Sequence, residues 1–135
     1  MFRKTLGTVC FCLVTLSNPA SADTGLSQEA DINKGLVIIA AADKIRRSCD
    51  TIGGRLFRAQ RYANSLKEVA RSRGYSDQQI AAFLDSTAER AKVREKRNVY
   101  FQNQGASNLD HASLCVLGYA EIARNSQIGY LLKAR

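Results

Sequence analysis

The stretch Arg73-Gly74-Tyr75-Ser76-Asp77-Gln78-Gln79-Ile80 carries the signals that end one helix and begin the next. Gly74 stands where a helix commonly ends in the left-handed conformation, which glycine adopts at little cost. Ser76 and Gln79 have the spacing of a capping box, and Tyr75 and Ile80 occupy the two positions of a hydrophobic staple. The stretch therefore predicts a helical hairpin.

The chain before this hairpin has one apolar face with helical spacing. Apolar or small residues recur in steps of three and four from Ile32 to Ala70, which is typical of an amphipathic helix. Gly53-Gly54 interrupts the run, and each glycine costs about 1 kcal/mol relative to alanine inside a helix. The pattern allows one long helix or two helices that meet at a bend. We favour the bend, because a straight helix of about 40 residues would be ~60 Å long.

Two further helical segments follow the hairpin. The first runs from Ile80 towards Gly105, and the second half of it is rich in charged residues. The second begins near Asn108, which can cap it while Asp110 lies in the first turn. No alternating strand pattern or internal repeat is present. The predicted fold class is all-α, a small bundle of about four helices.

The first 22 residues have the layout of a cleavable secretory signal peptide. Two positive residues precede an apolar run from Leu6 to Leu16, and small residues then lead to an A-x-A site that ends at Ala22. The run is shorter than the ~20 apolar residues of a spanning helix, so cleavage after Ala22 is favoured over an uncleaved anchor. We expect a signal peptide over 1–22, a flexible tail over 23–30, a helical domain over 31–135 and a periplasmic location.

Cleavage would leave two cysteines, Cys49 and Cys115, and each lies on an apolar helix face. In an exported protein such a pair predicts an intramolecular disulfide. A redox pair would favour the C-x-x-C spacing, and a metal would need more ligands. A bridge of this span would stabilise the fold by up to ~4 kcal/mol by restricting the unfolded chain.

Basic residues are in excess over the whole chain, with 20 Lys and Arg against 12 Asp and Glu. Without the leader, 18 basic residues remain against the same 12 acidic ones, for a net charge of +6. Five of them are predicted to form a partner-binding face on the helix after the hairpin: Arg90, Arg94, Arg97, Lys92 and Lys96. A solvated face of mixed charge is the alternative, since Glu89 and Glu95 lie among them.

Residue types that carry chemistry are few. His111 is the only histidine, and the metal and haem motifs that use histidine are absent, so neither a metal nor a cofactor is expected. Glu121 interrupts an apolar segment, and a buried glutamate can act as the general acid of a muramidase-like enzyme. No second carboxylate is identifiable, and an ion pair with Arg124 or with an arginine of the first helix is the plainer interpretation.

Several segments resemble a known family. Cys49-Asp50, Gly74-Tyr75-Ser76-Asp77 and the pattern C-x-x-G-x-x-E-I-x-x-x-S-x-I-G-x-L-L over 115–132 are similar to a small exported helical family of alphaproteobacteria that is known only as a domain of unknown function. The likeness covers nearly all of the chain after the leader. It agrees with the predicted leader boundary and disulfide, and it implies no catalytic mechanism.

The expected function is that of a non-enzymatic periplasmic binding or accessory protein with a protein partner in the envelope. Its basic face would meet an acidic partner or an anionic membrane surface, whereas nucleic acid is an unusual partner outside the cytoplasm. Two alternatives stay open, a small envelope hydrolase that uses Glu121 and a periplasmic stress chaperone. The sequence leaves the oligomeric state undetermined.

Overall fold

The structure is a computed structural model that describes residues 24–135. The predicted leader and its cleavage after Ala22 lie outside the described residues. The elements, in chain order, are α1 (Thr24–Gln28), α2 (Ala30–Ser48), β1 (Ile52–Gly54), α3 (Leu56–Ser72), α4 (Asp77–Asp85), α5 (Thr87–Asn103), α6 (His111–Ala123), α7 (Gln127–Leu131) and β2 (Leu132–Ala134).

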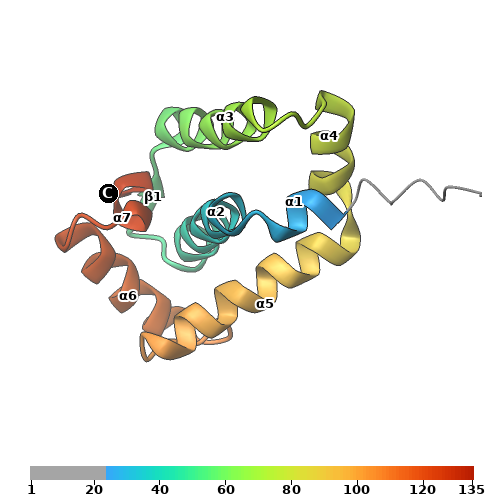
Figure 1. Cartoon of the computed structure of the whole chain (residues 1–135). Helices are drawn as coiled ribbons and strands as arrows, with labels where there is room; N and C mark the ends of the chain where they lie inside the picture. The colour runs from blue at the N-terminus through green and yellow to red at the C-terminus, as the bar shows by residue number, and fades with distance from the viewer. Residues whose placement is uncertain (1–23) are drawn as a thin grey trace, which may run out of the picture.

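The helix α2 runs through the centre of the molecule and packs against α1, α3, α5, α6 and α7 (Figure 1). The pair β1 and β2, together with α7, lies at one end, and α1 and α4 lie at the other. The predicted helical class is confirmed, but the expected number of about four helices is wrong. The described residues form seven helices and a two-stranded sheet.

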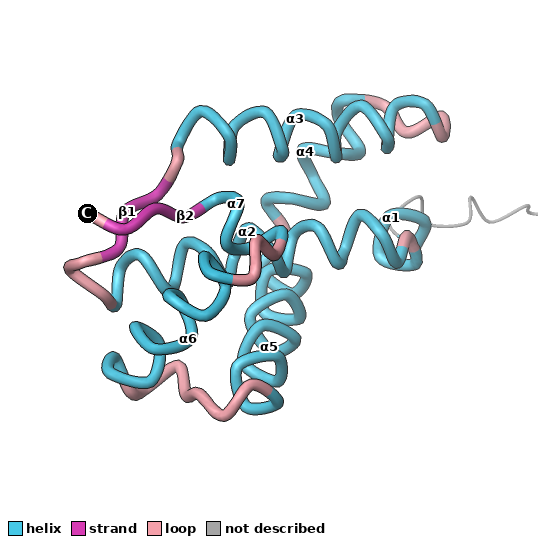
Figure 2. Tube along the Cα trace, turned by 90° about the vertical axis from the view of Figure 1, so that its left-hand side faces the viewer, coloured by secondary structure: helices cyan, strands magenta, loops and turns pink. Residues whose placement is uncertain are grey.

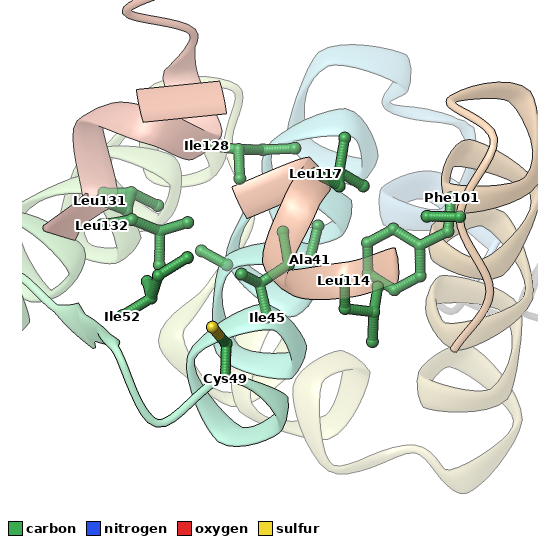
Figure 3. Close-up of a cluster of buried hydrophobic side chains, with 12 residues drawn as sticks. Ala41, Ile45, Cys49, Ile52, Phe101, Leu114, Leu117, Ile128, Leu131 and Leu132 are labelled. Carbon is green, nitrogen blue, oxygen red and sulfur yellow. The ribbon is translucent and has the colours of Figure 1, made fainter. Parts of the chain in front are cut away.

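Two apolar clusters hold this arrangement together. The larger one surrounds the C-terminal half of α2, and Figure 3 shows side chains of α2, α5, α6, α7 and the sheet meeting there. The smaller one lies at the other end of α2 and consists of Leu26, Ile32, Ala70, Ile80 and Phe83. The apolar face predicted from Ile32 onwards therefore supplies both clusters.

The Gly53-Gly54 pair lies in a strand and not in a bent helix. β1 pairs with β2 in antiparallel register, with Gly53 opposite Lys133 and Gly54 opposite Leu132 (Figure 2). A Cβ on Gly53 would lie 3.1 Å from the Arg135 Nε, and one on Gly54 would lie 2.9 Å from the Arg46 Cδ. Strands of three residues are too short to display an alternating pattern, so periodicity does not predict them.

The predicted hairpin is confirmed. Gly74 has a φ of +91°, and the Ser76 and Gln79 side chains form both hydrogen bonds of the capping box. The helix expected beyond Ile80 is divided, however, because Ser86 ends α4 and its hydroxyl accepts a hydrogen bond from the Glu89 N–H at the start of α5. The helical pattern continues across this break, which is why periodicity alone suggested one helix.

The ends of the predicted domain also differ from expectation. Residues 24–28 form α1 instead of a flexible tail, and Leu26 is buried with 4 % of its surface exposed. The Asn33 side-chain amide donates to the carbonyls of Leu26 and Glu29, which ties α1 to α2. At α6 the N-cap is Asp110, whose carboxylate accepts from the Ala112 N–H, and not Asn108.

The disulfide between Cys49 and Cys115 is present, with a Cα–Cα distance of 5.2 Å. It joins the end of α2 to α6, and the Cys49 side chain lies inside the larger apolar cluster (Figure 3). The predicted pairing is therefore confirmed. The bridge thus links two helices that both contribute side chains to that cluster.

Candidate interaction surface

The five basic residues of the predicted partner-binding face all lie on α5, but they differ in their neighbours. Arg90 pairs with Asp85 at 3.1 Å and also donates to the Leu84 carbonyl, and Lys92 pairs with Glu89 at 2.7 Å. These two charges are therefore largely compensated by α4 and by α5 itself.

The other three basic residues of α5 have no carboxylate partner within residues 24–135. The Arg97 guanidinium donates to the Asn98 side chain and lies 5.8 Å from the centre of the Phe101 ring. Burial, and after it the nearby Arg94, lowers the pKa of Arg97. Arg94 and Lys96 are exposed and form no ion pair with any described residue.

Arg94 and Lys96 border different hollows. Arg94 stands at the edge of a hollow of about 290 Å³ that Leu36, Phe83 and Val93 line. Lys96 lines another, of about 380 Å³, beside α1 and α2. Arg90 borders the same hollow as Arg94 and Lys96 borders the other, so these basic side chains do not face a single site. Their role in binding stays a prediction.

Ion pairs account for most of the acidic side chains. Of the eleven acidic residues described, eight are paired: Glu29, Asp31, Asp43, Glu68, Asp77, Asp85, Glu89 and Glu121. Eleven basic residues of the described part have no such partner: Lys34, Lys44, Arg55, Arg58, Arg61, Lys67, Arg94, Arg97, Lys96, Lys133 and Arg135. The uncompensated charge of the surface is therefore positive.

Part of this charge gathers at the end of the molecule that carries the sheet. We call the set there the ribbon-end patch, and it comprises the basic residues Arg55, Arg58, Lys133 and Arg135 and the exposed apolar or aromatic residues Leu56, Phe57 and Tyr130. Sequence reasoning missed this patch. Its local signal is the start of α3, where Leu56 and Phe57 stand between two arginines and no acidic residue is present in the first turn.

Contacts between α3, α7 and β2 hold the ribbon-end patch together. The Arg58 guanidinium lies 4.4 Å from the centre of the Tyr130 ring, and the Arg55 Nε donates to the Leu132 carbonyl at 2.9 Å. The side chains of Lys133 and Arg135 lie beside Gly53, within 3.4 Å of where its Cβ would be. Segments more than 70 residues apart in the chain thus contribute to one surface.

Glu121 is the one carboxylate of the described chain that is completely buried, with no exposed surface. Its oxygens accept hydrogen bonds from the Tyr100 hydroxyl of α5, the Arg124 guanidinium and the Ser126 hydroxyl. The predicted ion pair with Arg124 is confirmed. The hydrogen bonds join α5, α6 and α7 at a point where an unpaired carboxylate would strongly destabilise the fold.

The surroundings of Glu121 suit a structural carboxylate. Burial, and after it the hydrogen bond to Glu121, raises the pKa of Tyr100 to about 12. The hydrogen bond to the same carboxylate raises the pKa of Arg124. Complete burial and hydrogen bonds from Tyr100, Arg124 and Ser126 are typical of a carboxylate that holds neighbouring elements together.

The residues of the pattern over 115–132, which resembles that of a known family, pack closely against neighbouring elements in the structure. A Cβ on Gly118 would lie 2.6 Å from Ile45 and Ile52 side-chain atoms, and one on Gly129 would lie 2.0 Å from the Glu121 carbonyl oxygen. The pattern's Ile128, Leu131 and Leu132 are buried in the larger cluster. These residues therefore set how closely α6 and α7 approach their neighbours.

The structure also shows where the one histidine and the other metal-ligating residue types lie. His111 lies exposed in the first turn of α6, and residues 24–135 contain no group of three or more metal-ligating side chains. None of the helices described has the length and hydropathy required to cross a membrane.

Comparison with known proteins places the chain in a family. A family model described as "Family of unknown function (DUF5333)" matches residues 24–133, and the chain belongs to this family. The match begins where the described structure begins and ends in β2. No curated protein and no solved structure shows significant similarity to the chain.

Proposed function

We propose that this protein is an exported, non-enzymatic binding or accessory protein that docks on an acidic partner through its basic side chains. The observation that carries the proposal is the imbalance of ion pairs, in which eight acidic side chains are paired internally while eleven basic ones are not. Uncompensated positive charge attracts acidic surfaces and speeds association with them.

Two features support a location outside the cytoplasm. The leader-like residues 1–22 have the layout of an export signal, and the Cys49–Cys115 disulfide is of the kind that persists in oxidising compartments. A periplasmic protein of this charge would encounter acidic proteins and anionic lipids of the envelope.

The non-enzymatic part of the proposal is supported by the burial of Glu121. A general acid must reach its substrate, whereas this carboxylate has no exposed surface and uses its oxygens to hold three neighbouring side chains. A substitution that removes the Glu121 carboxylate should therefore lower the stability of the fold, whether or not a reaction is affected.

The test is affinity purification of the exported protein from its own envelope, at low salt and at high salt, with mass spectrometry of what is retained. We expect a partner that is recovered at low salt, lost at high salt and lost from the double variant Arg94→Glu, Lys96→Glu. The matched control Arg61→Glu, Lys67→Glu reverses two charges on α3 and should retain it. The absence of any salt-sensitive partner would overturn the proposal.

A further inference from the structure

We infer that the ribbon-end patch is a docking surface for an anionic lipid bilayer. The inference rests on the proposed function only for the location of the protein in the envelope. It concerns a different surface from the basic residues of α5, so the two can be tested separately.

The first argument is the exposure of the apolar side chains at this end. Phe57 is 88 % exposed and Leu56 is 67 % exposed, and they are consecutive at the start of α3. Tyr130, 45 % exposed, lies next to them on α7, because the Arg58 side chain contacts its ring. Apolar and aromatic side chains that project together are the part of a peripheral protein that enters the headgroup region.

The second argument is charge complementarity. Arg55, Arg58, Lys133 and Arg135 surround these side chains, and none of the four forms an ion pair within the described residues. Two acidic residues lie near the patch. The Asp50 backbone carbonyl accepts from Arg135, and Asp43, which lines the same hollow as Leu56, is paired with Arg46 and Arg47. Clusters of Lys and Arg beside apolar anchors favour membranes that carry anionic lipid.

The third argument is the position of the patch. β1, α7 and the last residues of the chain lie together at one end of the molecule in both views, and α3 starts directly from β1 (Figures 1 and 2). A bilayer is flat, so a protein can reach it most easily with a projecting end. Leu56 and Phe57 occupy such an end, at the start of α3, and Leu56 also borders a hollow of about 420 Å³ beside α7.

The experiment is co-sedimentation of the protein, purified after export, with vesicles of phosphatidylcholine alone or with about one third phosphatidylglycerol. We expect binding to the anionic vesicles at low salt, little binding to the neutral ones, and weaker binding at high salt. The variant Lys133→Ala, Arg135→Ala should bind the anionic vesicles about thirtyfold more weakly than the wild type. The variant Leu56→Ser, Phe57→Ser should bind them at least about tenfold more weakly.

Matched controls distinguish this site from a general effect of charge or hydrophobicity. Lys34→Ala, Lys44→Ala removes the same charge from α2, and Leu109→Ser, Val116→Ser removes two apolar side chains of 86 % and 72 % exposure near α6. Both should bind like the wild type. Equal binding by wild type and patch variants, or no binding to anionic vesicles, would overturn the inference. The inference would also be overturned if the patch variants lost binding to a soluble acidic protein while the wild type did not bind vesicles.

Discussion

Glu121 has a carboxylate whose burial is offset by hydrogen bonds from three side chains. Tyr100, Arg124 and Ser126 donate to it, and Arg124 also donates to the Tyr100 hydroxyl at 2.8 Å. Hydrogen bonds to a charged group contribute more than neutral ones, and loss of the charge weakens all of them together.

The variant Glu121→Gln should lower the free energy of unfolding by about 2 kcal/mol, because the ion pair with Arg124 is lost and one acceptor oxygen becomes an NH2 group that faces donors. Urea denaturation followed by circular dichroism measures this. The control Glu95→Gln changes an exposed glutamate without an ion pair and should have little effect. Unchanged stability together with loss of a wild-type cell-wall hydrolase activity would show that Glu121 is catalytic.

Arg73 is the residue that attaches the first turn of α2 to the hairpin. It donates to both carboxylate oxygens of Asp31 and also to Glu29. The hydrogen bond from Arg73 lowers the pKa of Asp31 to about 2, and its contribution to stability is therefore present above pH 4 and lost as the pH falls towards 2.

The variant Arg73→Gln should therefore be less stable than the wild type at pH 5, and the difference should shrink as the pH falls to 2. Urea titrations at the two pH values measure it. Arg61→Gln, which removes an exposed arginine without an ion pair, serves as the control. A difference between Arg73→Gln and wild type that is independent of pH would contradict this account.

At the scale of single residues, sequence reasoning predicted partners only where they are close in the chain. Arg124 lies three positions after Glu121, so the helical period indicates the contact. Tyr100 lies 21 positions away, and its contact with Glu121 depends on how α5 packs beside α6. The ribbon-end patch combines the start of α3 with residues more than 70 positions later, and no local pattern could have joined these two segments.

At the scale of elements, the position of α7 depends on the close approach of its backbone at Gly129 to the backbone of α6 at Glu121. Gly129 lies so near the Glu121 carbonyl that a Cβ would be 2.0 Å from its oxygen. The Ser126 hydroxyl accepts from the Gly129 N–H and so caps the helix at the same point.

The variant Gly129→Ala should lower the free energy of unfolding by about 3 kcal/mol, because the backbone of α6 or α7 must move to admit the methyl group. Gly74→Ala is a useful comparison, since no atom lies within 4 Å but the φ of +91° is unfavourable for alanine. It should cost about 1 kcal/mol. Differential scanning calorimetry compares the two, and an equal effect would show that the contact at Gly129 is relaxed.

Helix ends that carry clear capping residues were predicted correctly, whereas elements without such residues were missed. The hairpin at Gly74 and Ser76 follows from the capping residues alone. The break at Ser86 was missed although Ser86 and Glu89 have capping spacing, because the apolar period continues through it. The sheet was missed because its strands depend on pairing between residues about 80 positions apart.

For the whole molecule, the disulfide is the strongest link between distant parts of the chain. It closes a loop with a sequence separation of 66, between α2 and α6. Replacing both cysteines by serine should lower the free energy of unfolding by up to about 4 kcal/mol, since the unfolded chain regains the freedom of the closed loop. Thermal unfolding with and without reductant measures this. A variant as stable as the wild type, in the absence of reductant, would contradict it.

We expect the protein to be an exported domain in which Cys49 and Cys115 are joined. Intact mass spectrometry of protein purified from its native envelope, after alkylation without reduction, tests both parts in one measurement. We predict a chain that begins at Asp23 and carries no alkyl group. A chain that retains residues 1–22, or one with both thiols alkylated, would contradict the account.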